Sequence, residues 1–460
     1  MSSVVAIPWG DEPPLELRLP DGWPDPDVIQ PMLDGAIADY RAALTTALDA
    51  PLGGIDPIEE QVGPRSTVAI VVDDPSRWTP VREALPIVLE RLRARGVSQK
   101  DISISVGVGR HHAVDAEAMT RRVGDEVAAS YSCFSPPVDD LSQYEDLGTT
   151  DDGIPVRVFR PVAQADLRIL IGSVLPHLQA GFGGGYKLIF PGTSHRSTLG
   201  AIHRVGLGGD AGALLGSTAE ANPMRRAIRG AASRLGPCVS LSHVLGPPGQ
   251  VFQVASGHPD AVQDHLAAEV ARRYRAPDAE PADVVIAGNA PWPGDPMQSF
   301  KVLLNHRSAC RSGGALVGFF WTNPAEIDRS FPMPAMRAIA ATGAPGGLVM
   351  RRGLAMADRL VAASGSAASF MVRWARELVV DRDVLVYAPP LRDRIGPRLG
   401  PIRLYSDPAE LRNRLEILAR SAGTPSPRVR IFPSGGLTYC PARSAADTKE
   451  GVHSQGKNRR

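Results

Sequence analysis

Short apolar runs alternate with amphipathic helical stretches through most of this chain. The short runs are typical of buried strands, and the stretches between them have the periodicity of helices. Such alternation predicts an α/β fold with largely parallel sheets. Strands are predicted over residues 68–72, 102–106, 167–171, 251–255, 284–287, 315–320, 384–386, 402–405 and 429–432. Helices are predicted over residues 80–95, 115–123, 198–204, 260–273, 297–309 and 408–419.

The alternation restarts after residues 274–281, a proline-containing segment that reads as a linker. A chain of 460 residues is also longer than one hydrophobic core usually organises. We therefore predict two α/β domains with a cleft between them. The first covers residues 1–275, with a strand-and-helix lead-in at its start, and the second covers residues 283–440. Residues 441–460 are polar and are predicted to be a disordered tail.

The charge balance excludes several classes of partner. The formal net charge is +1, which gives no electrostatic reason to bind nucleic acid or an anionic membrane surface. No apolar run reaches the roughly 18 residues of a spanning helix. The four cysteines are scattered without a CxxC pair, which fits a reducing compartment. The sequence thus predicts a cytoplasmic protein without nucleic-acid or membrane partners.

A glycine-rich run connects His177 to Lys187 and reads HLQAGFGGGYK. Glycines let backbone N–H groups approach a ligand closely, and a lysine at the end of the turn suits an anionic or covalently held one. The run is not a phosphate-binding Walker loop, because tyrosine precedes the lysine and leucine follows it. Apolar segments flank it, which disfavours a solvated linker. We predict a binding loop built on Gly183, Gly184 and Gly185.

Polar residues follow two other predicted strands. Asp74 and Arg77 come after the first strand, where the arginine fork could bind a carboxylate or phosphate. The alternative interpretation is an ordinary helix cap with a solvated arginine. His111 follows the next strand and is an acid/base candidate, although the adjacent glycines form only an incomplete dinucleotide fingerprint. Ligands of parallel sheets bind beyond the carboxyl ends of strands. The two loops and the glycine-rich run could therefore converge.

Two further groups have open interpretations. His203 lies in a predicted helix, where a lone histidine is usually structural. Together with His177 and His195 it could instead ligate zinc, but the spacing matches no compact zinc pattern. Gln298 and Lys301 lie one helical turn apart and share a face. They could grip a carboxylate, or they could belong to a solvated surface.

Taken together, these spacings resemble the lactate racemase family of nickel-pincer enzymes, over about residues 65–310. The family has an Asp-x-Thr-Arg loop, a Gly-Thr-His loop, a His and an Ala-Gly-Phe-x-Gly-Gly run before a lysine, a later histidine, and a Pro-x-Asp followed by Gln-x-x-Lys. The matching residues here are Asp74 to Arg77, Gly109 to His111, His177, Ala180 to Gly184, Lys187, His203, Pro293, Asp295, Gln298 and Lys301.

The resemblance implies a cofactor and a role for each residue. The cofactor would be a nickel-pincer nucleotide, a nickel pyridinium-3,5-bisthiocarboxylic acid mononucleotide derivative, bound covalently to Lys187 as a thioamide. His203 would complete the nickel coordination, and Asp74 with the glycine loop would help to hold the cofactor. His111 and His177 would be the catalytic acid/base pair. The set that binds the substrate would be Arg77, Gln298 and Lys301.

The implied activity is that of an isomerase. A racemase or epimerase inverts the carbinol carbon of a 2-hydroxy acid by hydride transfer to the cofactor, while one imidazole takes the hydroxyl proton and the other returns it. Such an enzyme depends on cofactor-biosynthesis enzymes. Because of departures from the family pattern at Trp78, His112 and Tyr186, a larger 2-hydroxy acid or a sugar acid epimerised at C2 is as consistent with the sequence as lactate. The alternatives are a zinc-dependent hydrolase and a non-catalytic protein that binds the cofactor.

Overall fold

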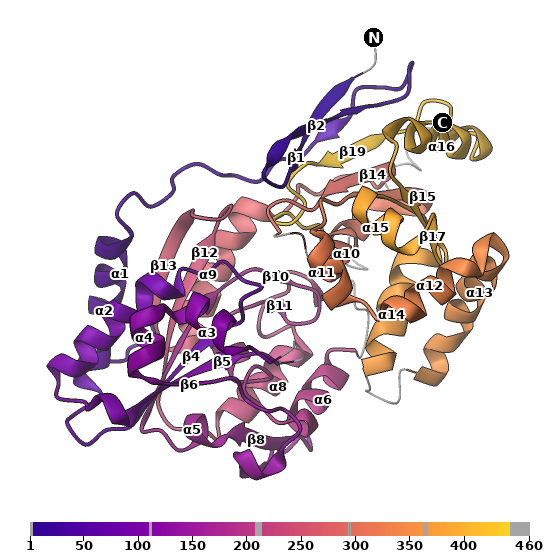
Figure 1. Ribbon diagram of the computed structural model, residues 1–460. Coiled ribbons are helices and arrows are strands. Elements are labelled where there is room, and N and C mark those ends of the chain that lie inside the picture. The colour runs from indigo at the N-terminus through magenta and orange to yellow at the C-terminus, as the bar shows by residue number, and fades with distance from the viewer. Residues whose placement is uncertain are drawn as a thin grey trace, which may run out of the picture. The chain divides into compact units, whose positions relative to one another are not determined.

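The computed structural model describes residues 3–109, 113–207, 214–292, 294, 296–361 and 367–441, and Figure 1 shows their course. The chain divides into two compact units, each built around its own sheet. The first unit comprises Leu33–Gly209 and Gly216–Arg273. The second comprises Met1–Met32, Asp210–Leu215 and Tyr274–Arg460. Both contain parallel strands and helices, which confirms the predicted α/β class.

The first unit is built on a six-stranded sheet in the order β13-β12-β9-β4-β5-β6, in which only β13 is antiparallel to its neighbour. Its strands are β4 Val68–Asp73, β5 Ile102–Gly107, β6 Ser132–Phe134, β9 Leu167–Ser173, β12 Cys238–Leu245 and β13 Val251–Gly257, with the small pairs β7 Tyr144–Thr149, β8 Pro155–Phe159, β10 Pro176–His177 and β11 Gly181–Phe182. Its helices are α1 Tyr40–Asp49, η1 Ile58–Glu60, α2 Val81–Ala94, η2 Gln99–Asp101, α3 Ala116–Val123, α4 Asp125–Ser130, η3 Leu141–Gln143, α5 Arg160–Ala163, η4 Gly185–Leu188, α6 Arg196–Val205, α8 Pro223–Ala232 and α9 Pro259–Tyr274.

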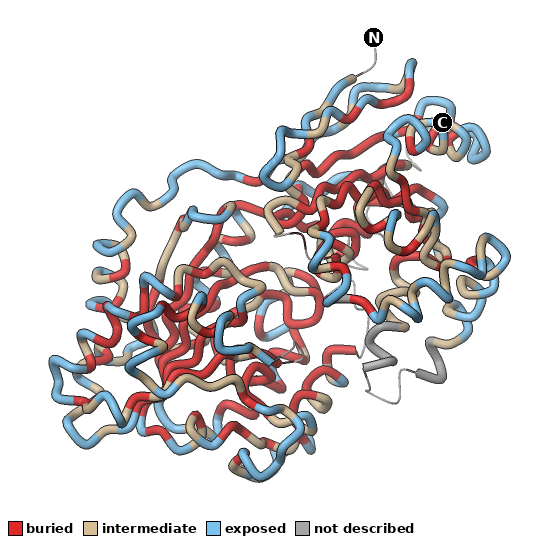
Figure 2. Tube along the Cα trace, viewed as in Figure 1, coloured by how far each residue is buried: buried red, intermediate tan, exposed pale blue. Residues whose placement is uncertain are grey.

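Both faces of this sheet are covered. Alternate side chains of a strand point to opposite faces, so Val68, Ile70 and Val72 join a core with α1, α2 and α3. Ala69 and Val71 point the other way, into a core with α6, α8 and the β7–β8 pair. Figure 2 shows the resulting layer of buried strands. A sheet buried on both faces explains why its central strands read as continuous apolar runs.

The second unit is built on a seven-stranded sheet in the order β17-β18-β16-β15-β14-β19-β3. Its strands are β1 Val4–Trp9, β2 Glu12–Arg18, β3 Asp27–Val28, β14 Ala282–Gly288, β15 Cys310–Phe319, β16 Asp383–Tyr387, β17 Arg398–Leu399, β18 Ile402–Tyr405 and β19 Val429–Phe432. Its helices are α10 Pro296–His306, η5 Arg307–Ala309, α11 Pro324–Ser330, α12 Met333–Ala341, α13 Gly343–Val361, α14 Ala367–Val379, α15 Pro389–Ile395 and α16 Pro408–Ser421.

The amino-terminal segment differs from its predicted place in the first domain. β3 pairs in parallel with β19, and the β1–β2 hairpin contributes Ile7 and Leu17 to the core of the second unit. Residues 1–32 therefore group with the carboxy-terminal half of the chain. Pairing between strands about 400 positions apart leaves no local signal. The segment predicted as a linker, residues 274–281, groups with the second unit. Its Ala276 N–H donates to Tyr439 O of the same unit at 2.9 Å. Residues 442–460, most of the predicted tail, lie outside the described residues.

No helix within the described ranges combines the length and the apolar character that a membrane crossing requires. The described cysteines, Cys133, Cys238, Cys310 and Cys440, are all free thiols.

Among the described residues, His243 of the first unit and His306 of the second are fully buried and neutral, which makes the stability of each unit depend on pH. His243 Nδ1–H donates to Gly172 O and its Nε2 accepts from the Tyr40 hydroxyl, both at 2.8 Å. His306 donates from Nδ1 to Val302 O and accepts at Nε2 from Thr438. Burial lowers the pKa of each histidine to about 4.

We expect the free energy of unfolding to fall as the pH falls from about 6.5 to about 4. In this window the unfolded chain binds protons at these two histidines and the folded chain does not. Each could contribute up to about 3 kcal/mol, from 1.36 kcal/mol per pKa unit. Urea unfolding at several pH values measures the slope. His243→Gln and His306→Gln should each flatten it, and an unchanged slope in both variants would contradict the assignment.

Candidate active site

Three loops of the first unit leave one edge of its sheet. Strands β9, β4 and β5 are adjacent and parallel, so their carboxyl ends lie at the same edge. The loop after β4 carries Asp74 and Arg77, and the loop after β9 carries His177 and Lys187. His111 belongs to the loop after β5 but lies outside the described residues. Gly109 lies at the described start of that loop, and its N–H donates to Gly192 O at 2.9 Å. The loop is thereby bonded to the segment that follows Lys187.

The loop after β4 is a tight turn closed by Asp74. Its Oδ1 accepts from Ser76 N–H at 2.9 Å, and its carbonyl accepts from Arg77 N–H at 3.0 Å. Helix α2 begins only at Val81, so Asp74 does not cap it. The helix-cap interpretation of Asp74 is therefore wrong. The Asp74 side chain orders the turn that places Arg77 at the sheet edge.

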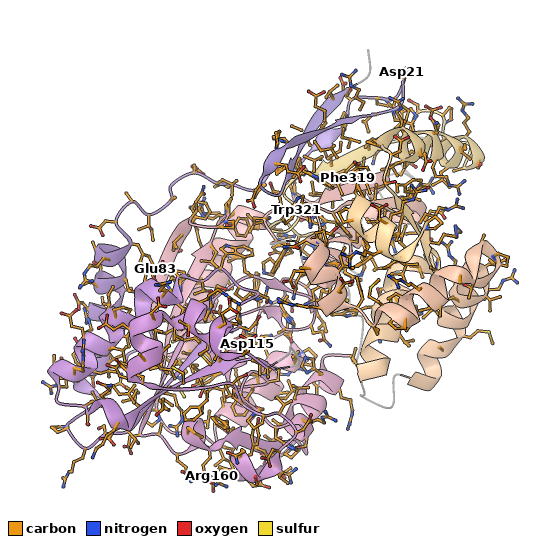
Figure 3. The ribbon with its side chains drawn as sticks, viewed as in Figure 1. Asp21, Glu83, Asp115, Arg160, Phe319 and Trp321 are labelled. Atoms are coloured by element: carbon orange, nitrogen blue, oxygen red, sulfur yellow. The ribbon has the colours of Figure 1, made fainter. Side chains whose placement is uncertain are left out.

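Arg122, which the sequence did not single out, clamps this turn from α3. Its guanidinium donates to the carbonyl oxygens of Asp73 at 2.9 Å and Arg77 at 3.0 Å, and it forms a buried ion pair with the Asp73 carboxylate. The Thr79 hydroxyl donates to the same carboxylate at 2.6 Å. Burial raises the pKa of Asp73, while Arg122 and Thr79 act in the opposite direction. Asp115, labelled in Figure 3, caps α3 and so fixes the helix that carries Arg122.

We expect Arg122→Met to lower the free energy of unfolding by about 3–5 kcal/mol, because it leaves the Asp73 carboxylate buried without its ion-pair partner. Equilibrium urea unfolding measures the change. The matched control is Arg121→Met, whose exposed arginine pairs with Glu117 on the surface of the same helix and should change stability by less than about 1 kcal/mol. Equal losses in the two variants would contradict the clamp.

The loop after β9 is a compact turn whose glycines face protein atoms. Gly181, Gly184 and Gly185 have positive φ values of 72°, 78° and 59°, which favour glycine. A Cβ on Gly181 would lie 2.3 Å from Ser217 O, and one on Gly184 would lie 2.9 Å from the Val174 side chain. Gly183 N–H donates to Leu175 O at 2.8 Å, so this donor serves the turn itself. Close packing within the protein thus accounts for much of the glycine content.

Arg225 on α8 forms hydrogen bonds with backbone carbonyl groups of this loop. It is 2% exposed, and its Nη2 donates to the carbonyl oxygens of Phe182 at 2.7 Å and Gly183 at 2.9 Å. Burial lowers the pKa of Arg225 to about 9, so the side chain remains a cation at neutral pH. Asn222, which caps α8, donates to Gln179 O at 3.0 Å. The Asn222-Pro223 pair signals a helix start, but no local signal shows that Arg225 is buried under the glycine loop.

His177 is oriented by its own loop. Its Nδ1 accepts from Gln179 N–H at 3.2 Å and from Ala180 N–H at 3.1 Å. An acceptor of two N–H groups carries no hydrogen, so the hydrogen of the neutral ring is on Nε2. The loop that leads to Lys187 therefore also sets the tautomer of His177.

His203 has the opposite tautomer. Its Nδ1–H donates to Leu199 O at 2.8 Å, one turn back along α6, which places the lone pair of the neutral ring on Nε2. Metal-ligating histidines usually have this arrangement, with the second nitrogen donating to a carbonyl. Gln179 Nε2 donates to His203 O at 3.5 Å, so the end of α6 lies beside the glycine loop.

The three histidines of the zinc alternative do not form a metal site. No cluster of three or more His, Cys, Asp or Glu suited to a metal occurs within the described part of the chain, which includes His177, His195 and His203. His195 caps the start of α6 and accepts from Ser197 N–H, whereas His203 lies near the other end of the same helix. A separation of eight helical positions corresponds to about 12 Å. The geometry gives a zinc-dependent hydrolase no support.

Gln298 and Lys301 belong to the second unit, on the first turns of α10. The Lys301 ammonium donates to Gln298 Oε1 at 2.9 Å and lies 5.9 Å from the ring centroid of Trp374. The two side chains thus form one polar pair, as their helical spacing predicted. Asn289 follows β14 and holds the amino-terminal part of α10 in place. Its side-chain amide donates to the Ser299 hydroxyl and to Trp321 O, both at 2.8 Å. Pro293 and Asp295 lie outside the described residues.

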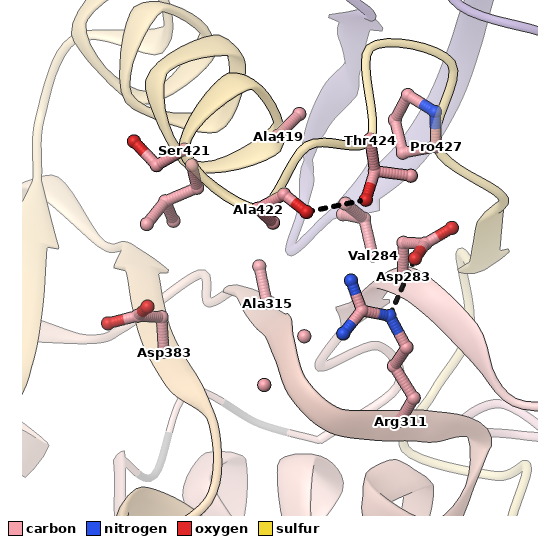
Figure 4. Close-up of a pocket in the computed structure, with 13 residues that line it drawn as sticks. Asp283, Val284, Arg311, Ala315, Asp383, Ala419, Ser421, Ala422, Thr424 and Pro427 are labelled. Atoms are coloured by element: carbon pink, nitrogen blue, oxygen red, sulfur yellow. Dashed lines mark hydrogen bonds and ion pairs between the residues drawn. The ribbon is translucent and has the colours of Figure 1, made fainter.

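A hollow of about 230 Å³ occurs elsewhere in the second unit, as Figure 4 shows. Asp283, Arg311, Asp383 and the end of α16 line it, and Arg311 Nε donates to Asp283 at 2.6 Å. Asp283 and Asp383 lie at the amino ends of their strands, whereas Gln298 and Lys301 follow the carboxyl end of β14. None of the predicted site residues that the structure describes lines this hollow.

Comparison with known proteins shows a similarity to lactate racemases. Residues 11–213 match the model of the lactate racemase N-terminal domain. The chain is also 26% identical over 322 residues to the lactate racemase of Thermoanaerobacterium thermosaccharolyticum, an alignment that covers 68% of this chain and 73% of that protein. The chain is therefore similar to lactate racemases, and residues 11–213 match their N-terminal domain. A lactate racemase of Lactiplantibacillus plantarum is 29% identical over 157 residues, covering 34% of this chain and 37% of that protein.

Two solved structures share the fold. The lactate racemase apoprotein from Thermoanaerobacterium thermosaccharolyticum superimposes with a TM-score of 0.75 at 19% identity. The match covers 96% of this chain and 100% of that one. A protein from Thermotoga maritima superimposes with a TM-score of 0.58 at 15% identity, covering 84% of this chain and 96% of that one.

Two departures from the lactate racemase family pattern are packed into the first unit. The indole N–H of Trp78 donates to Gly246 O at 2.7 Å and so joins the loop after β4 to the loop after β12. The hydroxyl of Tyr186 lies 3.5 Å from His258 Nε2, and burial raises the pKa of Tyr186. Both residues therefore help to fix the loops that carry Arg77 and Lys187. The third departure, His112, lies outside the described residues.

Proposed function

We propose that this chain inverts the carbinol carbon of a 2-hydroxy acid, as a racemase or, on a sugar acid, as a C2 epimerase. The observation that supports this most directly is the single sheet edge in the first unit. The loops of Asp74, Arg77, His177 and Lys187 leave this edge, and the end of α6 with His203 lies beside them. Acid/base, amine and metal-ligand chemistry are thereby available in one neighbourhood.

The proposed cofactor is the nickel-pincer nucleotide, made by separate biosynthesis enzymes and joined covalently to Lys187. The residues present fit such a group. His203 has its lone pair on Nε2 through the bond from Nδ1–H to Leu199 O, as a metal ligand requires. Lys187 follows a turn that is fixed by hydrogen bonds from Arg225. When bound, the cofactor supplies the hydride acceptor, and the protein supplies orientation and proton transfer.

The proposed roles of the protein residues follow from inversion at one carbon. His111 and His177 face the substrate from opposite sides, so that one takes the hydroxyl proton of one enantiomer and the other returns a proton when the opposite enantiomer forms. His177 would donate from Nε2, since its Nδ1 is engaged by two backbone N–H groups. Arg77, Gln298 and Lys301 would bind the carboxylate or the intermediate oxygen.

The test is co-expression with cofactor-biosynthesis enzymes, followed by intact mass and chiral assays. We expect a mass increase of nucleotide size and interconversion of the enantiomers of at least one acid in a panel of lactate, larger 2-hydroxy acids and C2-epimeric sugar acids. Substrate deuterated at the carbinol carbon should keep the label in both enantiomers in ordinary water, because the hydrogen moves as hydride. Loss of the label to water would contradict the hydride route, and an unmodified, inactive chain would contradict the proposal.

A further inference from the structure

The glycine loop is held by a buried cation that lies outside the family motifs. Besides the bonds to Phe182 O and Gly183 O, Arg225 approaches Gly184 O at 3.3 Å and Ala180 O at 3.4 Å. Gln263 on α9 adds a bond to Gly183 O at 3.2 Å. Within the described ranges, Arg225 forms no ion pair with a carboxylate. Its charge is stabilised by the carbonyl groups of this one loop and, without direct contact, by the charges of Asp260 and Asp264.

This arrangement sets the direction of the peptide groups. In a trans peptide the C=O and N–H bonds point in opposite directions. Because the carbonyls of Gly183 and Gly184 face Arg225, the N–H groups of Gly184 and Gly185 point to the other side of the loop. The positive ends of these peptide dipoles add to the charge of the guanidinium behind them. That side of the loop is consequently suited to an anionic group.

The carbonyl of Gly184 also forms a hydrogen bond with the backbone of Lys187. Gly184 O accepts from Arg225 and, at 3.3 Å, from Lys187 N–H. One acceptor thus links the buried guanidinium to the backbone of the residue proposed to carry the cofactor. A loss of Arg225 would remove a buried donor from the carbonyls of Phe182, Gly183 and Gly184, although Gly183 O would keep the bond from Gln263 and Gly184 O the bond from Lys187 N–H.

We propose that Arg225 is a positioning residue for cofactor attachment, which fixes the peptide groups of residues 182–184 and through them Lys187. The attached group rests on the proposed function, whereas the order of the loop does not. The variants that test it are Arg225→Met, which removes the donors, and Arg225→Lys, which keeps the charge but not the planar fork. The matched control is Arg226→Met, on the exposed side of the same helix.

The first measurement is backbone hydrogen exchange in the unloaded chain. We expect Arg225→Met to raise exchange over residues 181–188 at least about tenfold while β9 stays protected, and Arg225→Lys to restore part of the protection. The second is the adduct at Lys187 after co-expression. At equal amounts of folded protein it should fall at least about tenfold in Arg225→Met relative to Arg226→Met. If Arg225→Met does not fold, Arg225→Lys and Gln263→Leu should show the same local effect.

Three results would overturn the proposal, two of them in hydrogen exchange. One is unchanged exchange over residues 181–188, and the other is an equal rise in β9, which would mean a general loss of stability. An adduct formed at the wild-type level in Arg225→Met would do the same. A wild-type chain that takes no adduct would instead remove the proposed function, and hydrogen exchange would still decide the role of Arg225 in the loop.

Discussion

Lys187→Ala should abolish both the nucleotide-sized adduct and racemisation, with an activity loss of at least about 1000-fold. Lys187 is the lysine at the end of the glycine loop, in the short helix η4. Without this amine the proposed cofactor would have no covalent tether, and the proposed hydride acceptor would be lost. Intact mass and a chiral assay on protein co-expressed with the biosynthesis enzymes measure the two effects together.

The control variants separate the tether from charge and fold. Lys187→Arg keeps a cation but cannot form the thioamide, so it should behave like Lys187→Ala. Lys100→Ala removes an exposed lysine of the same unit and should keep both adduct and activity. An adduct that persists in Lys187→Ala would place the attachment elsewhere and would refute the role given to the glycine loop.

His177→Asn should lower racemisation by about 100-fold to 10,000-fold while leaving the adduct in place. The imidazole is the proposed acid/base on one side of the substrate, and its ring is oriented by Gln179 and Ala180 N–H. Asparagine keeps a polar group there but cannot exchange a proton near neutral pH. The measurement is the initial rate from each enantiomer, at cofactor occupancy checked by mass.

This variant also decides between an enzyme and a cofactor carrier. A carrier would keep the adduct and show no racemisation that depends on His177. His111→Asn should give a loss of similar size, because inversion needs one base on each side. The control is His265→Asn, an exposed histidine of α9 in the same unit, which should retain full activity. Full activity in His177→Asn would remove this residue from the chemistry.

Local pattern predicted most of the two sheets. The runs at 68–72, 102–106 and 167–171 became β4, β5 and β9, and the helix after Asp115 is capped by that residue. β12 was not predicted, because Ser240, Ser242 and His243 interrupt the continuous apolar run that identified the other buried strands, although all of Cys238–Leu245 is buried. Its Ser240 and Ser242 bond to each other at 2.9 Å, which offsets their burial. Helices α11 to α14 were also missed.

The motif spacings were informative about the site because each reflects a single loop. Asp74 with Arg77, and His177 with Lys187, are positioned by turns of a few residues, and a turn is encoded by its own sequence. The residues that hold these turns were invisible at this level. Arg122 lies 49 positions from Asp73, and Arg225 lies 42 positions from Gly183. A surface arginine and a buried arginine look alike in a sequence until the partners are in place.

The sequence by itself determined the α/β class, the loops that follow three strands, and the family resemblance that the comparisons then supported. These features depend on local periodicity and on short spacings, which the chain carries regardless of its final packing. Only the tertiary structure decided that β3 joins the sheet of the second unit, that β9, β4 and β5 are neighbours, and that two buried arginines hold the candidate site. Such features arise from pairings and burial between distant segments, for which a linear pattern contains no direct signal.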